Sequence, residues 1–72
     1  MNVVQCRMGR AALNWSGKDL AEAARVSALT VVRFEGGQAV RADSLAAMQS
    51  AMEAAGVQFS RRSARLIVSV PE

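Results

Sequence analysis

The ionisable side chains of this chain suit the binding of a polyanion better than catalysis. Nine lysines and arginines outnumber six aspartates and glutamates, which gives a net charge of +3 at pH 7 and a pI of about 10.5. A basic balance favours partners such as nucleic acid, although many basic domains bind nothing acidic. The chain has no histidine, and it shows no paired carboxylates, no metal-ligand spacing and no phosphate-binding glycine loop. We therefore expect no enzyme, no metal and no cofactor.

The length of the chain and its single cysteine indicate one small domain. Seventy-two residues form a core that is marginal alone, so we expect tight helix packing or self-association. Cys6 has no histidine to activate it, and we expect it to be a buried small hydrophobic residue in a cytoplasmic protein. The sequence shows no signal peptide and no apolar run of about eighteen residues, so we expect no membrane partner. No linker or repeat divides residues 1–72.

Two short helices joined by a tight turn are predicted in residues 16–37. Ser16 and Asp19, three positions later, form a capping box for the first of them, and Ser27 can cap the second. Apolar or small residues recur where two crossed helices touch, at Leu20, Ala21, Ala24, Val26, Val31 and Phe34. This order of signals predicts a helix-turn-helix, a unit that reads DNA. Helix packing alone would demand these apolar residues, so we assign them to the core.

Two further helices are predicted on either side of this unit. Asn2 and Gln5 offer a capping box for a first helix over residues 3–14. A fourth helix is predicted over residues 42–55, ended by Gly56 in a left-handed conformation. The inner face of this fourth helix is formed by Leu45, Met48, Met52 and Ala55.

The apolar pattern alternates over the tail, residues 57–70, which predicts two short strands that end at Pro71. A two-stranded hairpin is only marginally stable in water, so this one must lie against the helices or pair with a second chain. Ile67 lies on the face opposite Leu66 and Val68, which leaves the last strand apolar on both sides and favours pairing with a second chain. We therefore assign dimerisation to Val57, Phe59, Leu66, Ile67, Val68 and Val70.

The order of these motifs resembles a known family. The matching run is LNWSGKDLAEAARVSALTVVRFEGGQAVRADSLAAMQSAMEAAGVQF, and it is similar to the lambda-repressor-like, Xre/Cro-type transcriptional regulators of bacteria and phages. The similarity covers residues 3–59. It implies a mainly α fold, a small bundle of four or five helices with a short C-terminal pair of β-strands. It also implies a repressor that binds a palindromic operator in double-stranded DNA as a homodimer, in the cytoplasm at the nucleoid.

The resemblance assigns DNA contacts to two sets of residues. The base-reading positions, at the start and outer face of the third helix, correspond to Ala28, Leu29, Val32 and Arg33. The positions that contact the DNA backbone correspond to Gly17, Lys18, Ser27, Thr30, Gln38 and Arg41. Of the base readers, Arg33 could bind guanine O6 and N7 together, a contact worth roughly 1 to 3 kcal/mol of discrimination. Relatives also pair an arginine of the first helix with a glutamate that closes the third, and Arg10 and Glu35 hold these places as a structural ion pair.

Several residues depart from the family's pattern. Arg25 stands where relatives carry a glycine in the turn, and a left-handed conformation there would cost roughly 1 kcal/mol. Gly17 replaces a polar residue, often glutamine, that binds phosphate in relatives. The reading face is poor in polar groups, so DNA shape could carry specificity, or the third helix or the tail strands could bind a protein partner instead. Arg61 and Arg62, together with Arg65, are either extra phosphate contacts or solvated loop charges.

Overall fold

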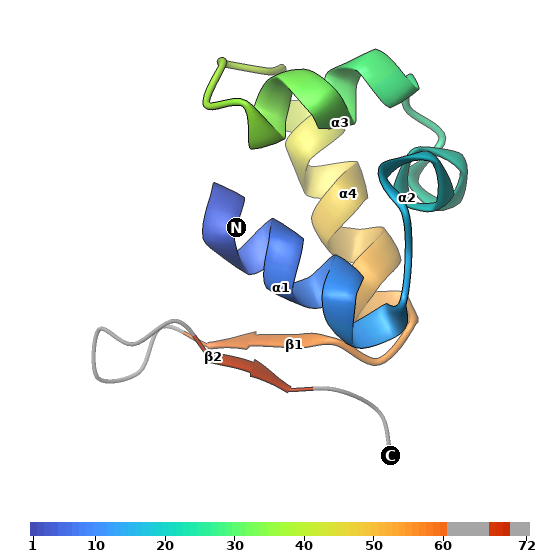
Figure 1. Cartoon of the computed structure of the whole chain (residues 1–72), viewed down its shortest axis with the longest axis vertical. Coiled ribbons are helices and arrows are strands. Elements are labelled where there is room, and N and C mark those ends of the chain that lie inside the picture. The colour runs from blue at the N-terminus through green and yellow to red at the C-terminus, as the bar shows by residue number, and fades with distance from the viewer. Residues whose placement is uncertain (61–66, 70–72) are drawn as a thin grey trace.

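The computed structural model describes residues 1–60 and 67–69, which form a mainly helical protein with two short strands (Figure 1). In chain order the helices are α1 (Val3–Leu13), α2 (Gly17–Ala24), α3 (Ala28–Glu35) and α4 (Ala42–Ala54). The strands are β1 (Gln58–Ser60) and β2 (Ile67–Ser69). The mainly helical fold is as predicted, and α1 and α4 each end one residue before the predicted position.

The capping boxes predicted for α1 and α2 are both present. At the start of α1, Asn2 Oδ1 accepts a hydrogen bond from the backbone N–H of Gln5 (2.8 Å), and Gln5 Oε1 accepts one from Asn2 N–H (2.9 Å). At the start of α2, Ser16 Oγ accepts from Asp19 N–H (3.0 Å), and Asp19 Oδ2 accepts from Ser16 N–H (2.9 Å). Each box satisfies backbone donors that have no partner within the helix, which fixes where the two helices begin.

Two helices end at a non-glycine residue in the left-handed conformation. Asn14 closes α1 with φ 58° and ψ 39°, and Arg25 closes α2 with φ 58° and ψ 40°. Arg25 thus does take the left-handed conformation whose cost the sequence analysis considered. Asparagine tolerates this region through local hydrogen bonding, whereas an arginine there carries about 1 kcal/mol of strain from its Cβ. The strained residue is the first of a turn only three residues long, 25–27, between α2 and α3.

The core lies where α2 packs against both α3 and α4, and where α1 packs against α3 and α4. Its buried apolar members are Cys6, Leu20, Ala21, Ala24, Val31, Phe34, Met48, Met52 and Val57. The predicted burial of Cys6 is confirmed, since none of the residue is exposed to solvent. Four helices thus contribute to one core, which holds α3 in a fixed orientation relative to the rest of the protein.

The position of Val57 corrects one of the predicted dimer contacts. Only 1% of Val57 is exposed, because the chain turns back at Gly56 (φ 105°) and inserts the valine beneath α1 and α4. The backbone N–H of Val57 donates to the carbonyl of Met52 (3.0 Å), which completes the end of α4. The assignment of Val57 to a dimer interface is therefore wrong, since its side chain belongs to the core of its own chain.

Gly9 lies on the face of α1 that packs against α4 and β1. A Cβ atom placed on Gly9 would lie 2.7 Å from Met52 Sδ, 3.6 Å from Val57 Cγ1 and 3.7 Å from Phe59 Cζ. A methyl group at this position would crowd the sulfur of Met52, which would have to shift, and would make ordinary contacts with Val57 and Phe59. The small size of Gly9 therefore suits the close packing of α1 against Met52.

The two strands form an antiparallel pair at one end of the molecule. Gln58 lies opposite Ser69, and Phe59 lies opposite Val68. Phe59 is half-buried and packs against the helical core, so the first strand is attached to the helices of its own chain. Figure 1 shows the hairpin directly below α1, whereas α3 lies at the opposite end of the protein. The strands and the outer face of α3 are therefore separate surfaces.

Candidate nucleic-acid interface

The outer face of α3 is apolar apart from one arginine. A helix of 3.6 residues per turn places Leu29, Val32 and Arg33 on one side and the buried Val31 and Phe34 on the other. Leu29 is 53% exposed and Val32 is 65% exposed, and Arg33 is exposed beside them. Exposed aliphatic side chains on one helix face make it a candidate binding surface, although Val4 and Met8 on α1 are also exposed, at 49% and 40%.

The predicted base-reading residues are brought together on this face. Ala28 is exposed at the first position of α3, next to the turn that joins it to α2. Ser27 and Thr30, expected at the DNA backbone, form the cap of α3: Ser27 Oγ accepts from Thr30 N–H (3.1 Å) and lies 2.8 Å from Thr30 Oγ1. The predicted cap at Ser27 is therefore confirmed. Because the two hydroxyls already form a hydrogen bond with each other, only one of them has its proton free to donate to a phosphate.

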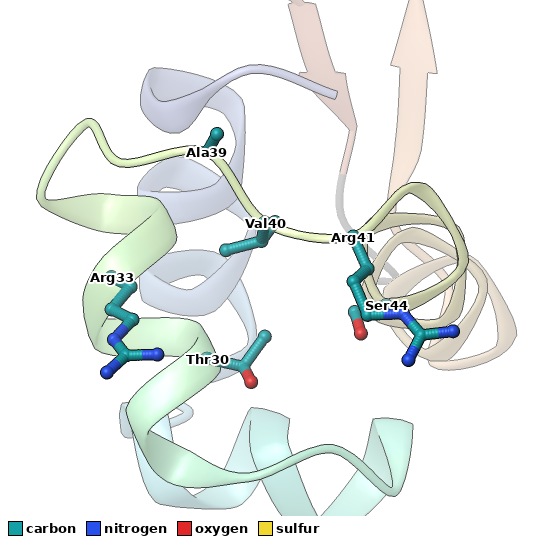
Figure 2. Close-up of a pocket in the computed structure, with 6 residues that line it drawn as sticks. All are labelled: Thr30, Arg33, Ala39, Val40, Arg41 and Ser44. Atoms are coloured by element: carbon teal, nitrogen blue, oxygen red, sulfur yellow. The ribbon is translucent and has the colours of Figure 1, made fainter.

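A groove separates α3 from the start of α4 (Figure 2). It has a volume of about 440 Å³ and is lined by Thr30, Arg33, Ala39, Val40, Arg41 and Ser44. Figure 2 shows Thr30 and Arg33 on α3, with Arg41 and Ser44 at the start of α4 across from them. Two arginines and two hydroxyl-bearing residues line the groove, and Figure 2 shows the guanidinium of Arg41 extending away from Thr30 and Arg33. An anionic oxygen cluster such as a phosphate would meet both guanidinium groups only if Arg41 turned inward.

Arg41 is held by an acidic neighbour that the sequence interpretation missed. Its Nη2 lies 3.1 Å from Asp43 Oδ2, and its Nε donates to Asp43 Oδ1 (3.2 Å). Both side chains are largely exposed, at 83% and 69%, and such exposed pairs are typically worth about 0.2 to 1 kcal/mol. Arg41 can therefore leave Asp43 and bind another anion at little cost in free energy. The Asp43 carboxylate would remain close to that anion and repel it.

The start of α2 lies against α3. A Cβ atom on Gly17 would lie 3.5 Å from Val31 Cγ1, an ordinary van der Waals distance, so the start of α2 is close to α3. Lys18, the next residue, is exposed, as is Gln38 in the loop after α3. Gly37, in the same loop, takes a left-handed conformation with φ 87°. Along the chain, the predicted phosphate-binding positions thus fall into one group before α3 and one group after it.

An ion pair fixes the far end of α3 to α1. Arg10 Nε donates to Glu35 Oε2 and Arg10 Nη2 to Glu35 Oε1, both at 2.7 Å. The third nitrogen, Nη1, donates to the carbonyl of Trp15 just before α2 (3.1 Å). Arg7 Nη2 donates to the backbone carbonyl of Glu35 (3.0 Å), and Cys6 Sγ donates to Glu35 Oε2 (3.3 Å). The predicted pair of Arg10 and Glu35 is therefore present, and it connects α1, α3 and the segment before α2.

The charges of this cluster favour the ionised pair. Burial acts to raise the pKa of Glu35, but hydrogen bonds from Arg10 and Cys6 and the positive charges of Arg10 and Arg7 outweigh it, so the pKa lies below its ordinary value. The hydrogen bond to Glu35 raises the pKa of Arg10. Burial, followed by the bond to Glu35, raises the pKa of the Cys6 thiol to about 12, which makes it a poor nucleophile.

Several predicted residues lie outside the part of the chain that the structure describes, namely Arg61, Arg62, Leu66 and Val70. Within residues 1–60 and 67–69, no helix is long and apolar enough to cross a bilayer. The same residues contain no cluster of three or more histidine, cysteine or acidic side chains that could hold a metal ion. Comparison of the sequence with models of protein families and with curated proteins finds no match.

Proposed function

We propose that this protein is a sequence-specific DNA-binding regulator of transcription, of the lambda-repressor-like, Xre/Cro type. In this proposal α2 and α3 are the helix-turn-helix, and α3 is the helix that enters the major groove. The observation that carries it is the outer face of α3, where Arg33 lies beside exposed Leu29 and Val32 and next to a groove that also holds Arg41. Leu29 and Val32 are not explained by core packing, because both side chains are exposed.

Arg33 is the main reader of sequence in this mechanism. Its guanidinium can donate two hydrogen bonds to guanine O6 and N7, which discriminates that base by roughly 1 to 3 kcal/mol. Thr30, Ser27 and Arg41 would contact the phosphates that flank the base, and Lys18 and Gln38 would extend the contacts on either side. Phosphate contacts set the register of α3 in the groove without reading sequence.

The active form in this proposal is a homodimer that acts as a repressor at the nucleoid. The hairpin lies at the end of the molecule opposite α3, so pairing of two chains through residues 58–70 would leave both α3 helices free (Figure 1). A palindromic operator requires those helices about 34 Å apart on one face of the DNA. Each chain is 30 Å in its longest dimension. Two chains joined end to end at their hairpins would hold the α3 helices farther apart than the operator requires, so the chains would have to meet at an angle.

Selection from a randomised DNA duplex library tests this function. The protein should enrich a palindromic site, and Arg33→Ala should lose preference for that site while keeping its helical circular dichroism spectrum. Arg33→Lys is the matched variant: it retains the positive charge but not the two-pronged geometry, so it should keep general DNA affinity and lose discrimination. If Arg33→Ala selected the same site as strongly as the parent, α3 would not be the reading helix.

A second candidate function is a protein-interaction module on the same fold. The exposure of Leu29 and Val32 favours it, since aliphatic side chains also form the centres of protein interfaces. Salt dependence separates the two functions. A DNA-binding dimer that neutralises six or more phosphates loses about a thousandfold in affinity between 50 and 200 mM salt. A weak response to salt, with no preference among duplexes, would support the protein partner.

A further inference from the structure

The outer face of α3 holds few groups that can read a base by hydrogen bonding. Leu29 and Val32, its two exposed large apolar side chains, have neither donors nor acceptors. Arg33 is the basic residue of the helix, and its one acidic residue, Glu35, is turned away and bonded to Arg10. The face therefore presents two aliphatic side chains and one guanidinium, with the Thr30 hydroxyl beside them already bonded to Ser27, and it lacks the amide or carboxylate that would read adenine or cytosine.

One apolar group is available in the major groove of DNA for such side chains to contact. Thymine carries a methyl group at C5, whereas the other base edges present hydrogen-bond donors and acceptors. An aliphatic side chain pressed against a donor or acceptor removes water from it without replacing the hydrogen bond, which is unfavourable. Leu29 and Val32 are therefore matched to C5-methyl groups and mismatched to the other edges.

We infer that Leu29 and Val32 recognise C5-methyl groups of pyrimidines beside the guanine bound by Arg33. The inference rests on the proposed DNA-binding function and deepens it by naming the bases that the site accepts. The charges around the two side chains favour DNA over an apolar protein surface: Arg33 and Arg41 border the groove next to them. Because 5-methylcytosine carries its methyl at the same C5 position as thymine, the face accepts it as well.

The size of the effect follows from the area of one methyl group. Transfer of a methyl-sized group from water to an apolar contact changes an equilibrium constant by about fourfold. A palindromic site presents each contact twice, so removing the same methyl from both half-sites should weaken binding by about sixteenfold. This change is well within the range of a fluorescence anisotropy titration with a labelled duplex.

The experiment replaces thymine by deoxyuridine in the selected site, one position at a time in both half-sites. Deoxyuridine pairs like thymine and lacks only the methyl group, so a loss of affinity reports the methyl contact itself. At one or two positions the parent protein should lose about sixteenfold. Leu29→Ala or Val32→Ala should bind the thymine and deoxyuridine sites nearly equally at its own position. Met8→Ala is the matched control, because Met8 is 40% exposed on α1, and it should keep the full response.

A second arm places cytosine at the sensitive position and then methylates it at C5. Methylation should recover at least fourfold in affinity for the parent protein and nothing for the corresponding alanine variant. If methylation has no effect, the acceptance of 5-methylcytosine is wrong. If deoxyuridine is tolerated at every thymine of a site that the protein still selects, methyl recognition is wrong and the DNA-binding function stands. If no duplex is preferred at all, both fail, and Leu29 and Val32 face a protein.

Discussion

Replacement of Glu35 by glutamine should weaken the attachment of α3 to α1 while preserving the size of the side chain. Glutamine keeps one acceptor oxygen but removes the charge to which two nitrogens of Arg10 donate at 2.7 Å. Hydrogen bonds to charged groups contribute about 1.5 to 3 kcal/mol each. Arg10 remains 23% exposed and glutamine retains one neutral bond, so we expect a loss of about 2 kcal/mol in the free energy of unfolding.

Such a loss is a large part of the stability of a chain of this length. Small proteins unfold with about 0.05 to 0.15 kcal/mol per residue, which gives roughly 4 to 11 kcal/mol for this one. In domains of this size each kcal/mol moves the melting temperature by about 4 to 8 °C, so Glu35→Gln should melt about 8 to 16 °C below the parent. Thermal and urea unfolding followed by circular dichroism would measure both quantities.

The pH dependence of the difference tests its cause. Because the pKa of Glu35 is lowered in the folded protein, its charge stabilises the fold above the ordinary glutamate pKa of about 4.3. That contribution disappears as the pH falls through the lowered pKa of the folded state, so parent and variant should converge in acid. Asp43→Asn, which removes an exposed ion pair, is the control and should change stability little. The reasoning would be refuted if the parent and Glu35→Gln had the same free energy of unfolding at pH 7, or if their difference persisted unchanged in acid.

Three further changes test other parts of the structure. Arg25→Gly should stabilise the protein by up to about 1 kcal/mol in urea unfolding, because it relieves the left-handed strain; Asn14→Gly, at the same backbone angles, should gain less, and an equal gain at both would contradict the account. Asp43→Asn should raise DNA affinity several-fold for a dimer, since it removes the negative charge paired with Arg41 at the groove in each half-site, whereas unchanged affinity would place the groove away from DNA. Removal of residues 61–72 should leave the helical spectrum intact and convert a dimer into a monomer in sedimentation, and a truncated chain that still dimerises would move the interface to the helices.

Local signals explain why the helices could be predicted from the sequence. The capping residues Asn2, Ser16 and Ser27 act on backbone groups within three positions, so their effect does not depend on the rest of the fold. The possibility of a left-handed conformation at Arg25 came instead from the family resemblance, in which a glycine holds this position. The pairing of Arg10 with Glu35 joins residues 25 positions apart, and it too was expected from family resemblance alone.

The features that the sequence did not predict depend on which distant segments of the chain pack against each other in the fold. An alternating pattern shows that Val57 is apolar on one face, but it does not show whether that face meets its own helices or a second chain. Gly9 gave no sequence signal because its importance comes from Met52 and Phe59, which lie far along the chain. The groove walls at Val40 and Ser44 depend on the path of the loop after α3.

The position of the ion pair on α3 separates the residues that anchor this helix from those that face outward. Arg10 holds Glu35, and the core holds Val31 and Phe34, all on the side of α3 away from Leu29 and Arg33. The residues that keep the helix in place are thus separate from those that face outward. New side chains could therefore be exchanged at the outward positions, by evolution or by grafting, and the helix would still be presented in the same orientation.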